Sequence, residues 1–248
     1  MTASLVIDGA VAQLTLERPE ALNALNRDIA RVLEHSLGRL ARSRDVTVVI
    51  VSGRGRAFCA GNDIAEMPKL KPAEAKALSS RWQRIMDGFA RLPQVTIAAV
   101  RGYALGGGCM LAAAQDIRIA ESSARFGLPE VTLGFNPSYG IARLLDVMGG
   151  GPARDLLLTG RIVDAAEALR VGLVTRVVPD GELDRAASAL AAAIARHPRG
   201  GLAATKAIVA DIRAGKSGSA AQAYAAALRR DTNARSRIAA FLTKKKDA

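Results

Sequence analysis

The chain has few residues of the kinds that mark several classes of protein. Two cysteines among 248 residues are too few for a disulfide framework or for a four-ligand zinc site. No apolar run approaches the roughly 20 residues that a membrane helix needs. Met1 to Ser4 lead straight into an apolar strand pattern without the basic region of a signal peptide. We therefore expect a cytoplasmic protein with no metal, no membrane partner and two buried free thiols.

Aromatic and acidic residues are also scarce. Aromatic residues make up 4% of the chain, and 35 Lys and Arg outnumber 23 Asp and Glu, giving a formal net charge of +12. Such a charge attracts anionic ligands. Arg27, Arg31, Arg39 and Arg42 share one face of an expected helix, a spacing that suits either nucleic-acid phosphates or a solvated surface. With few rings to stack on bases, we favour the solvated surface and expect no nucleic-acid partner.

The remaining composition is that of a globular α/β chain. Half of the residues are hydrophobic, which is enough for a sizeable core. Continuous β-branched runs at 46–51 and 95–100 predict strands buried on both faces, and residues 5–16 predict a hairpin that turns at Asp8-Gly9. Apolar spacing over 26–41 and 72–90 predicts helices. The alternation of strands and helices indicates an α/β fold.

The composition changes after Pro179. Ala-rich segments over 182–197, 202–213 and 219–242 predict helices without strands between them. We therefore expect a core of residues 1–180 followed by an all-helical region of residues 181–248. A helical region of this length needs a surface against which to pack.

Two glycine-rich segments, Phe58 to Ile64 and Tyr103 to Leu111, each follow a predicted buried strand. Glycine lets backbone N–H groups face a cleft because no Cβ blocks the approach. Two such loops can converge on one ligand oxygen and form an oxyanion hole. A phosphate-binding loop is the weaker interpretation, because no Gly-Lys-Ser/Thr follows and the G-x-G-x-x-G spacing is absent.

Together with Arg18 to Leu25, Arg125 to Glu130 and Leu133-Gly134, these segments resemble the enoyl-CoA hydratase/isomerase (crotonase) superfamily over nearly the whole chain. The resemblance implies a spiral of ββα units with a C-terminal helical oligomerisation region, in a homotrimer or homohexamer. It implies an acyl-CoA thioester as substrate, with coenzyme A part of that substrate and no separate cofactor. The phosphates of coenzyme A would suit the positive charge of the chain.

The resemblance also assigns roles to residues. It makes the backbone N–H groups of Asn62 and Gly107 the oxyanion donors, and the macrodipole of a helix that begins at Gly107 favours an anion there. It makes Glu130 the general base or acid, and burial is expected to raise its pKa as proton transfer requires. The positions expected to contact coenzyme A are Ala21, Ala24, Ala60 and Ile64.

Met110 departs from the hydratases of the family, which carry a glutamate at this position. Hydration uses two carboxylates around one water, and a thioether can neither accept nor deliver the proton. Moving a double bond needs only one base. The sequence therefore predicts a single-glutamate enoyl-CoA isomerase, with Met110, Phe135 and Tyr139 in the acyl pocket.

Other functions stay open. A hydratase, or a CoA-thioester hydrolase or lyase, would have to use another residue. Tyr139 is a candidate, because the segment Asn136 to Gly140 departs from the glycine-rich sequence that the family has here. We favour a space-filling role for its phenol. The alternative of another class is a non-catalytic protein of this fold that binds coenzyme A or RNA.

Overall fold

The computed structural model describes residues 2–66, 70–216, 221–223, 225–226 and 232–246. The chain divides into two compact units, Met1–Arg196 and His197–Ala248. The second unit contains α8 (Arg199–Arg213) and α10 (Thr232–Lys246), so the helical C-terminal region is confirmed. No helix among the described residues is long and apolar enough to cross a membrane.

The first unit is built around a six-stranded sheet in which only the first pair of strands is antiparallel. The antiparallel pair is the expected hairpin, with Asp8 opposite Val11 across the turn. The two predicted buried strands stand next to each other as β3 and β5. In spatial order the strands are β1 (Ala3–Asp8), β2 (Val11–Leu16), β3 (Val48–Gly53), β5 (Val95–Val100), β7 (Ile117–Glu121) and β10 (Arg176–Val178).

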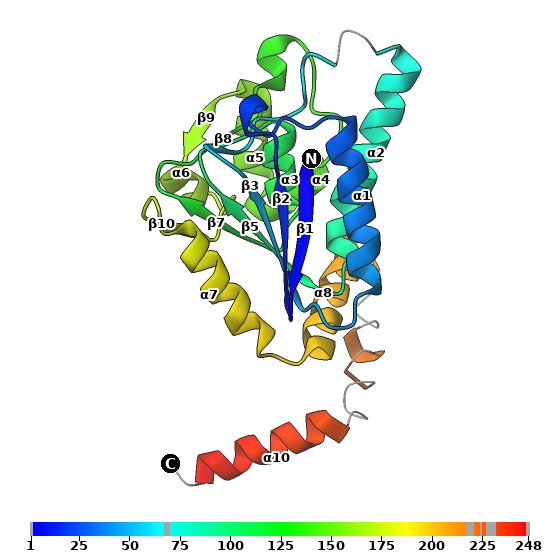
Figure 1. The fold of residues 1–248 in the computed structure, drawn as a ribbon, viewed down its shortest axis with the longest axis vertical. Coiled ribbons are helices and arrows are strands. Elements are labelled where there is room, and N and C mark those ends of the chain that lie inside the picture. Colours follow the sequence, from blue (N-terminus) through cyan, green and yellow to red (C-terminus); the bar gives the residue numbers. More distant parts are fainter. Residues whose placement is uncertain (1, 67–69, 217–220, 224, 227–231, 247–248) are drawn as a thin grey trace. The chain divides into compact units, whose positions relative to one another are not determined.

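A second, four-stranded sheet is interleaved with the first along the chain. Strand β3 is followed by β4, β5 by β6 and β7 by β8, so each pair adds one strand to each sheet. Helix α2 (Pro72–Arg91) follows the first pair and α3 (Gly107–Ala113) the second. This arrangement is the expected spiral of ββα units (Figure 1). The strands of the second sheet are β4 (Ala57–Cys59), β6 (Tyr103–Leu105), β8 (Arg125–Gly127) and β9 (Ile162–Asp164).

Helices cover both faces of the six-stranded sheet (Figure 1). On one face, Val49 and Val51 of β3 share a core with Ile29 and Leu33 of α1 (Arg27–Arg42) and with α2. On the other face, Val48 and its neighbours pack against α7 (Leu183–Ala195). Strands buried on both faces lack the polar alternation of a half-exposed strand. This explains the continuous β-branched runs of the sequence.

Helix α7 belongs to the first unit, which therefore extends past the boundary expected after residue 180. Leu183, Ala187 and Ala191 recur at helical spacing and are buried against β3, β5 and β7. Their small side chains let the helix lie close to the sheet. The other helices of this unit are α4 (Ile141–Met148), α5 (Gly150–Thr159) and α6 (Ala165–Arg170).

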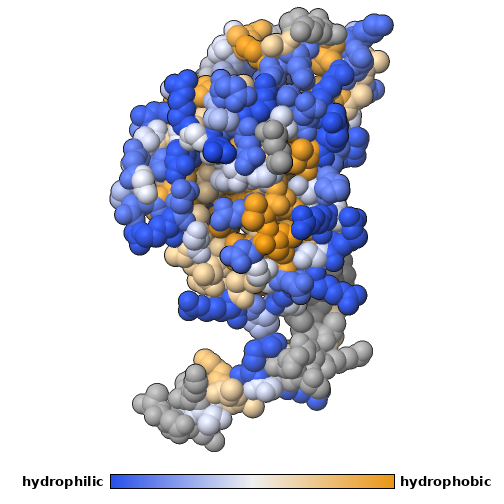
Figure 2. Space-filling model, in the orientation of Figure 1, coloured by the Kyte–Doolittle hydropathy of each residue, from blue (hydrophilic) through white to orange (hydrophobic). Residues whose placement is uncertain are grey.

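The surface of the molecule is polar over most of the face drawn in Figure 2, with an apolar patch near its centre.

In the first unit, the side chain of Val6 in β1 is 60% exposed, and Leu5 and Ile7 are partly buried. The exposed arginines of α1 include one, Arg31, that pairs with Asp28 at 3.1 Å.

Asn23 fixes the turn that precedes α1. The residue is fully buried, and its backbone adopts a left-handed conformation with φ of 58°. The amide nitrogen donates to the carbonyl oxygens of Arg54 and Ala57 at 3.0 and 2.8 Å, and the amide oxygen accepts from the N–H of Arg18 at 2.9 Å. The turn over residues 18–25 is thereby held against the β3–β4 connection.

Helix α3 approaches β4 without an intervening side chain at Gly108. A Cβ at this position would collide with the carbonyl oxygen of Cys59. Replacing Gly108 with alanine should lower the free energy of unfolding by about 1–3 kcal/mol, the range for an overpacked core. Denaturation by urea measures the change.

The matched control is Gly151→Ala in α5, where a Cβ would meet no atom within 4 Å. This variant should stay within about 1 kcal/mol of the wild type. Equal midpoints for Gly108→Ala and the wild type would contradict the prediction.

Candidate active site

The two glycine loops lie at the carboxyl ends of β4 and β6, which are parallel neighbours. The loop after β4 also pairs with the turn before α1. Leu25 donates its N–H to the carbonyl of Gly61 at 2.7 Å and accepts from the N–H of Asp63 at 2.9 Å. In such a bridge the intervening residue, Asn62, turns its own N–H to the other side. That N–H group bonds to no other residue in the described part of the chain.

Gly107 is the first residue of α3, so its N–H has no partner within the helix. The chain enters the helix through Gly106, whose φ is +50° and whose N–H donates to the carbonyl of Gly127 at 2.8 Å. A Cβ on Gly107 would lie 2.9 Å from Oδ1 of Asn62 and would collide with the hydroxyl of Tyr139. The two loops and Tyr139 therefore meet at this glycine.

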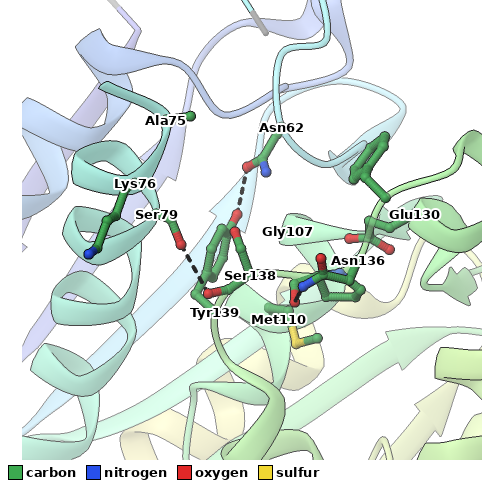
Figure 3. Close-up of a pocket in the computed structure, with 12 residues that line it drawn as sticks. Asn62, Ala75, Lys76, Ser79, Gly107, Met110, Glu130, Asn136, Ser138 and Tyr139 are labelled. Carbon is green, nitrogen blue, oxygen red and sulfur yellow. Dashed lines mark hydrogen bonds between the residues drawn. The ribbon is translucent and has the colours of Figure 1, made fainter. Parts of the chain in front are cut away.

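A pocket of about 350 Å³ opens at this meeting point (Figure 3). It brings together six of the residues expected at the site: Asn62, Gly107, Met110, Glu130, Phe135 and Tyr139. It also contains six that sequence analysis missed: Ala75, Lys76, Ser79, Asn136, Pro137 and Ser138. Ala75 and Ser79 stand four residues apart on α2, which places them on one face of the helix. That spacing is the only signal of their role in the sequence.

Glu130 brings a carboxyl group to the pocket. It is the second residue of the 3-10 helix Pro129–Leu133, and its side chain lies beside Gly106, with Oε1 2.9 Å from the place of a Cβ on that glycine. The residue is 8% exposed, and its Oε2 is buried without a hydrogen-bond partner among the described residues. Burial raises the pKa of the Glu130 carboxyl above its ordinary value, as expected for a desolvated acid.

Met110 lies one turn beyond Gly107 on α3 and is 1% exposed. Gly140 allows the next loop to pass close by, since a Cβ there would lie 3.0 Å from the Met110 sulfur. Among the pocket residues that the structure describes, Glu130 is the single carboxylate. Asp63 and Asp116 are occupied elsewhere: Asp63 accepts from Arg18 at 3.0 Å, and Asp116 accepts from the N–H of Thr96 at 2.8 Å.

Tyr139 is 4% exposed and projects its hydroxyl into the pocket. Its ring stacks on Trp82 of α2, with ring centroids 6.2 Å apart. The hydroxyl donates to Oδ1 of Asn62 at 2.6 Å (Figure 3). Burial raises the pKa of the Tyr139 phenol, so it stays a neutral hydroxyl at physiological pH.

The four residues expected to contact coenzyme A lie on the two segments beside the pocket and do not line it. The loop after β4 and the turn before α1 are joined by the N–H of Ala60, which donates to the carbonyl of Leu22 at 2.9 Å. Ile64 is 67% exposed. The contact of Ala21, Ala24, Ala60 and Ile64 with coenzyme A stays a prediction.

Both cysteines are free, fully buried and close to the loops that form the pocket. Cys59 ends β4 and Cys109 belongs to α3. Burial raises the pKa of each thiol to about 12. Within the described ranges, no cluster of three or more His, Cys, Asp and Glu residues could hold a metal ion.

Comparisons with known proteins agree with this geometry. A family model described as Enoyl-CoA hydratase/isomerase matches residues 6–247. A short-chain-enoyl-CoA hydratase of Clostridium acetobutylicum is 42% identical over 186 residues, which are 74% of this chain and 71% of that protein. A crotonyl-CoA hydratase of Syntrophomonas wolfei is 41% identical over 175 residues, 70% of this chain and 67% of that protein.

Solved structures share the fold. An enoyl-CoA hydratase of Mycobacterium smegmatis superimposes with a TM-score of 0.94 and 33% identity, over 98% of this chain and 97% of that one. DspI of Pseudomonas aeruginosa does so with a TM-score of 0.92 and 32% identity, over 98% and 94%. The sequence, the spiral of ββα units and the paired glycine loops place this chain in the enoyl-CoA hydratase/isomerase family.

Proposed function

We propose that this protein is a single-glutamate enoyl-CoA isomerase, which moves the double bond of an acyl-CoA between the 3,4 and 2,3 positions. The observation that carries the proposal is the pairing of Glu130, the one carboxylate among the described pocket residues, with an apolar Met110. One base can take a proton from one carbon and return it to another. Two proton-transfer groups are needed only when water is added.

The thioester oxygen is the place where negative charge develops when a proton leaves C2. In the proposed complex this oxygen lies between the N–H groups of Asn62 and Gly107, which have no partner among the described residues. Each such donor is worth roughly a hundredfold or more in rate when it is already in place before the reaction. Both groups belong to the main chain, and the Leu25–Asn62 bridge and the start of α3 fix their directions. No side chain has to change its rotamer before they can bind the oxygen.

Glu130 removes the C2 proton of a 3-enoyl-CoA and returns it to C4, which leaves the 2-enoyl isomer. Its burial supports this role, since it raises the pKa of the carboxyl and a raised pKa makes a carboxylate a better proton acceptor. The Glu130 carboxyl, which lines the pocket, is the group that we assign to this transfer. Coenzyme A would lie along Ala21, Ala24, Ala60 and Ile64.

Hydration is the second candidate function. It is favoured by the names of relatives such as the crotonyl-CoA hydratase, and by the Tyr139 hydroxyl in the same pocket as Glu130. A phenol that donates to Asn62 keeps a lone pair that can accept a hydrogen bond from water. In this scheme Glu130 would activate the water, and the Tyr139 hydroxyl would be the second group beside it.

Measurements on two substrates separate the two reactions. The wild type should convert a 3-enoyl-CoA to its 2-enoyl isomer much faster than it hydrates crotonyl-CoA, and Glu130→Gln should lower isomerisation by about 10²–10⁴-fold. Met110→Glu should raise hydration, because it adds a second carboxylate to the pocket. The neutral variant Met110→Gln serves as the control. Absorbance assays with the two substrates measure both rates, and efficient hydration by the wild type would overturn the isomerase proposal.

The burial of Glu130 should also appear in the pH dependence of stability. The folded-state pKa lies above the unfolded value, so the contribution of this group to stability is complete below the unfolded pKa of about 4.3 and is lost as the pH rises through the folded pKa. Glu130→Gln, which cannot ionise, should be more stable than the wild type at pH 8 and equally stable at pH 4. Urea denaturation at both values measures this.

Glu20→Gln is the control for this measurement, because the side chain of Glu20 is 72% exposed. It should show no such pH-dependent gain. The same stability difference at pH 8 and pH 4 for Glu130→Gln would contradict the assignment of a buried, hard-to-ionise carboxyl.

The oligomeric state is a further part of the proposal, as a homotrimer or homohexamer formed through the C-terminal helical region. Large apolar side chains of α10 support it, because Phe241 and Ile238 are 68% and 60% exposed. Light scattering on the intact chain should give three or six times the 25.9 kDa of one chain. A monomer at micromolar concentration would overturn this assignment.

A further inference from the structure

The hydrogen bond between Tyr139 and Asn62 has no part in the proton transfer assigned to Glu130, although it lies inside the pocket. It joins residues 77 positions apart, with the phenolic hydroxyl donating to Oδ1 of Asn62 at 2.6 Å. Both side chains lie against Gly107, whose N–H is one of the proposed donors to the thioester oxygen. The bond is therefore next to the point where charge develops.

Helix α2 sets the position of Tyr139 independently of Asn62. The hydroxyl of Ser79 donates to the carbonyl of Ser138 at 3.0 Å, and the N–H of Gly140 donates to Oε1 of Gln83 at 2.9 Å. Between these two anchors the tyrosine ring stacks on Trp82. Three contacts to α2 thus hold the phenol in place. Its fixed hydroxyl can therefore orient the Asn62 side chain.

The hydroxyl of Tyr139 occupies the acceptor end of the Asn62 amide beside Gly107. Oδ1 is held on the Tyr139 side, and the amide nitrogen is turned away from the tyrosine (Figure 3). That nitrogen has no hydrogen bond to another residue in the described ranges, and Asn62 is partly exposed in the pocket. An amide N–H₂ group beside an oxyanion is attractive, whereas an amide oxygen in the same place is repulsive.

We propose that Tyr139 is a positioning residue, which keeps Oδ1 of Asn62 bonded to the phenol and so leaves the N–H₂ end of the carboxamide as the end available to the thioester oxygen as that atom becomes negative. This inference rests on the proposed function, because it requires a thioester oxygen at the two backbone N–H groups. Without the phenolic hydroxyl the amide can turn over, and its acceptor oxygen then opposes the developing charge.

A double-mutant cycle on Tyr139→Phe and Asn62→Ala tests the proposal. Phenylalanine keeps the ring that stacks on Trp82, and alanine keeps the backbone N–H of residue 62. Each single variant should lower kcat about tenfold with KM changed less than about threefold, because the interaction forms with the charge. In the Asn62→Ala background, Tyr139→Phe should have no further effect, since the side chain through which it acts is gone.

The rate is measured in two ways, as isomerisation of a 3-enoyl-CoA and as exchange of the C2 protons of butyryl-CoA in D₂O, followed by NMR. Exchange reports enolate formation alone and is common to isomerase and hydratase chemistry. Tyr103→Phe is the matched control, because it removes the hydroxyl of a tyrosine that is 42% exposed and lies outside the pocket lining. Its rates should equal those of the wild type.

Asn62→Asp gives a readout that a packing role would not produce. A carboxylate has acceptor oxygens at both ends and no donor, so exchange should fall by at least about a hundredfold. Full activity of this variant would overturn the proposal, as would a Tyr139→Phe effect that persists undiminished in the Asn62→Ala background. Failure of the wild type to exchange C2 protons would overturn the proposed function as well, whereas exchange without coupling between the two residues would remove only the role of Tyr139.

Discussion

Main chain packs against main chain where β4, β6 and α3 meet, and the arrangement of the site depends on that close approach. Gly108 brings α3 against the carbonyl of Cys59, and Gly61 brings the loop of Asn62 against the carbonyl of Leu105 at the end of β6. Because these groups belong to the backbone, strand pairing and the Leu25 bridge set their directions, and side-chain rotamers do not. A rigid pair of N–H groups can therefore coexist with a variable pocket wall. In this chain that wall consists of residues such as Met110, Phe135 and Tyr139.

Much of the framework follows from local sequence. The β-branched runs predict β3 and β5 because a strand covered on both faces has no polar side, and the Asp8-Gly9 turn predicts the first hairpin. Asn26 begins α1 as expected for an N-cap, its Oδ1 accepting from the N–H of Ile29 at 2.9 Å. The glycine segments and Glu130 were identified from motif order, and the structure places them at one pocket. Each of these features is encoded within a few neighbouring residues.

Features that depend on distant residues could not be predicted in this way. The apolar stripe of α7 predicts that one face of the helix is buried. It does not show whether that face packs against the sheet of the first unit or against another helix. The loop from Asn136 to Gly140 departs from the family's sequence pattern, so the resemblance did not predict its backbone path. The bond from Tyr139 to Asn62 needs both this path and the anchoring by α2. The choice between isomerase and hydratase is of the same kind, because it depends on where side chains converge and not on which motifs are present.

The burial of the two thiols bears on the chemical durability of the protein. A 2-enoyl thioester is an electrophile, and a thiolate adds readily to its C3 to give a stable thioether. Cys59 and Cys109 stand within three residues of the backbone groups proposed to bind such a compound, but their pKa of about 12 and their complete burial keep them protonated and out of reach. Small, soft side chains fill the tight space beneath the loops. The two thiols therefore lie next to the pocket in a protonated, inaccessible form that is unreactive towards unsaturated thioesters.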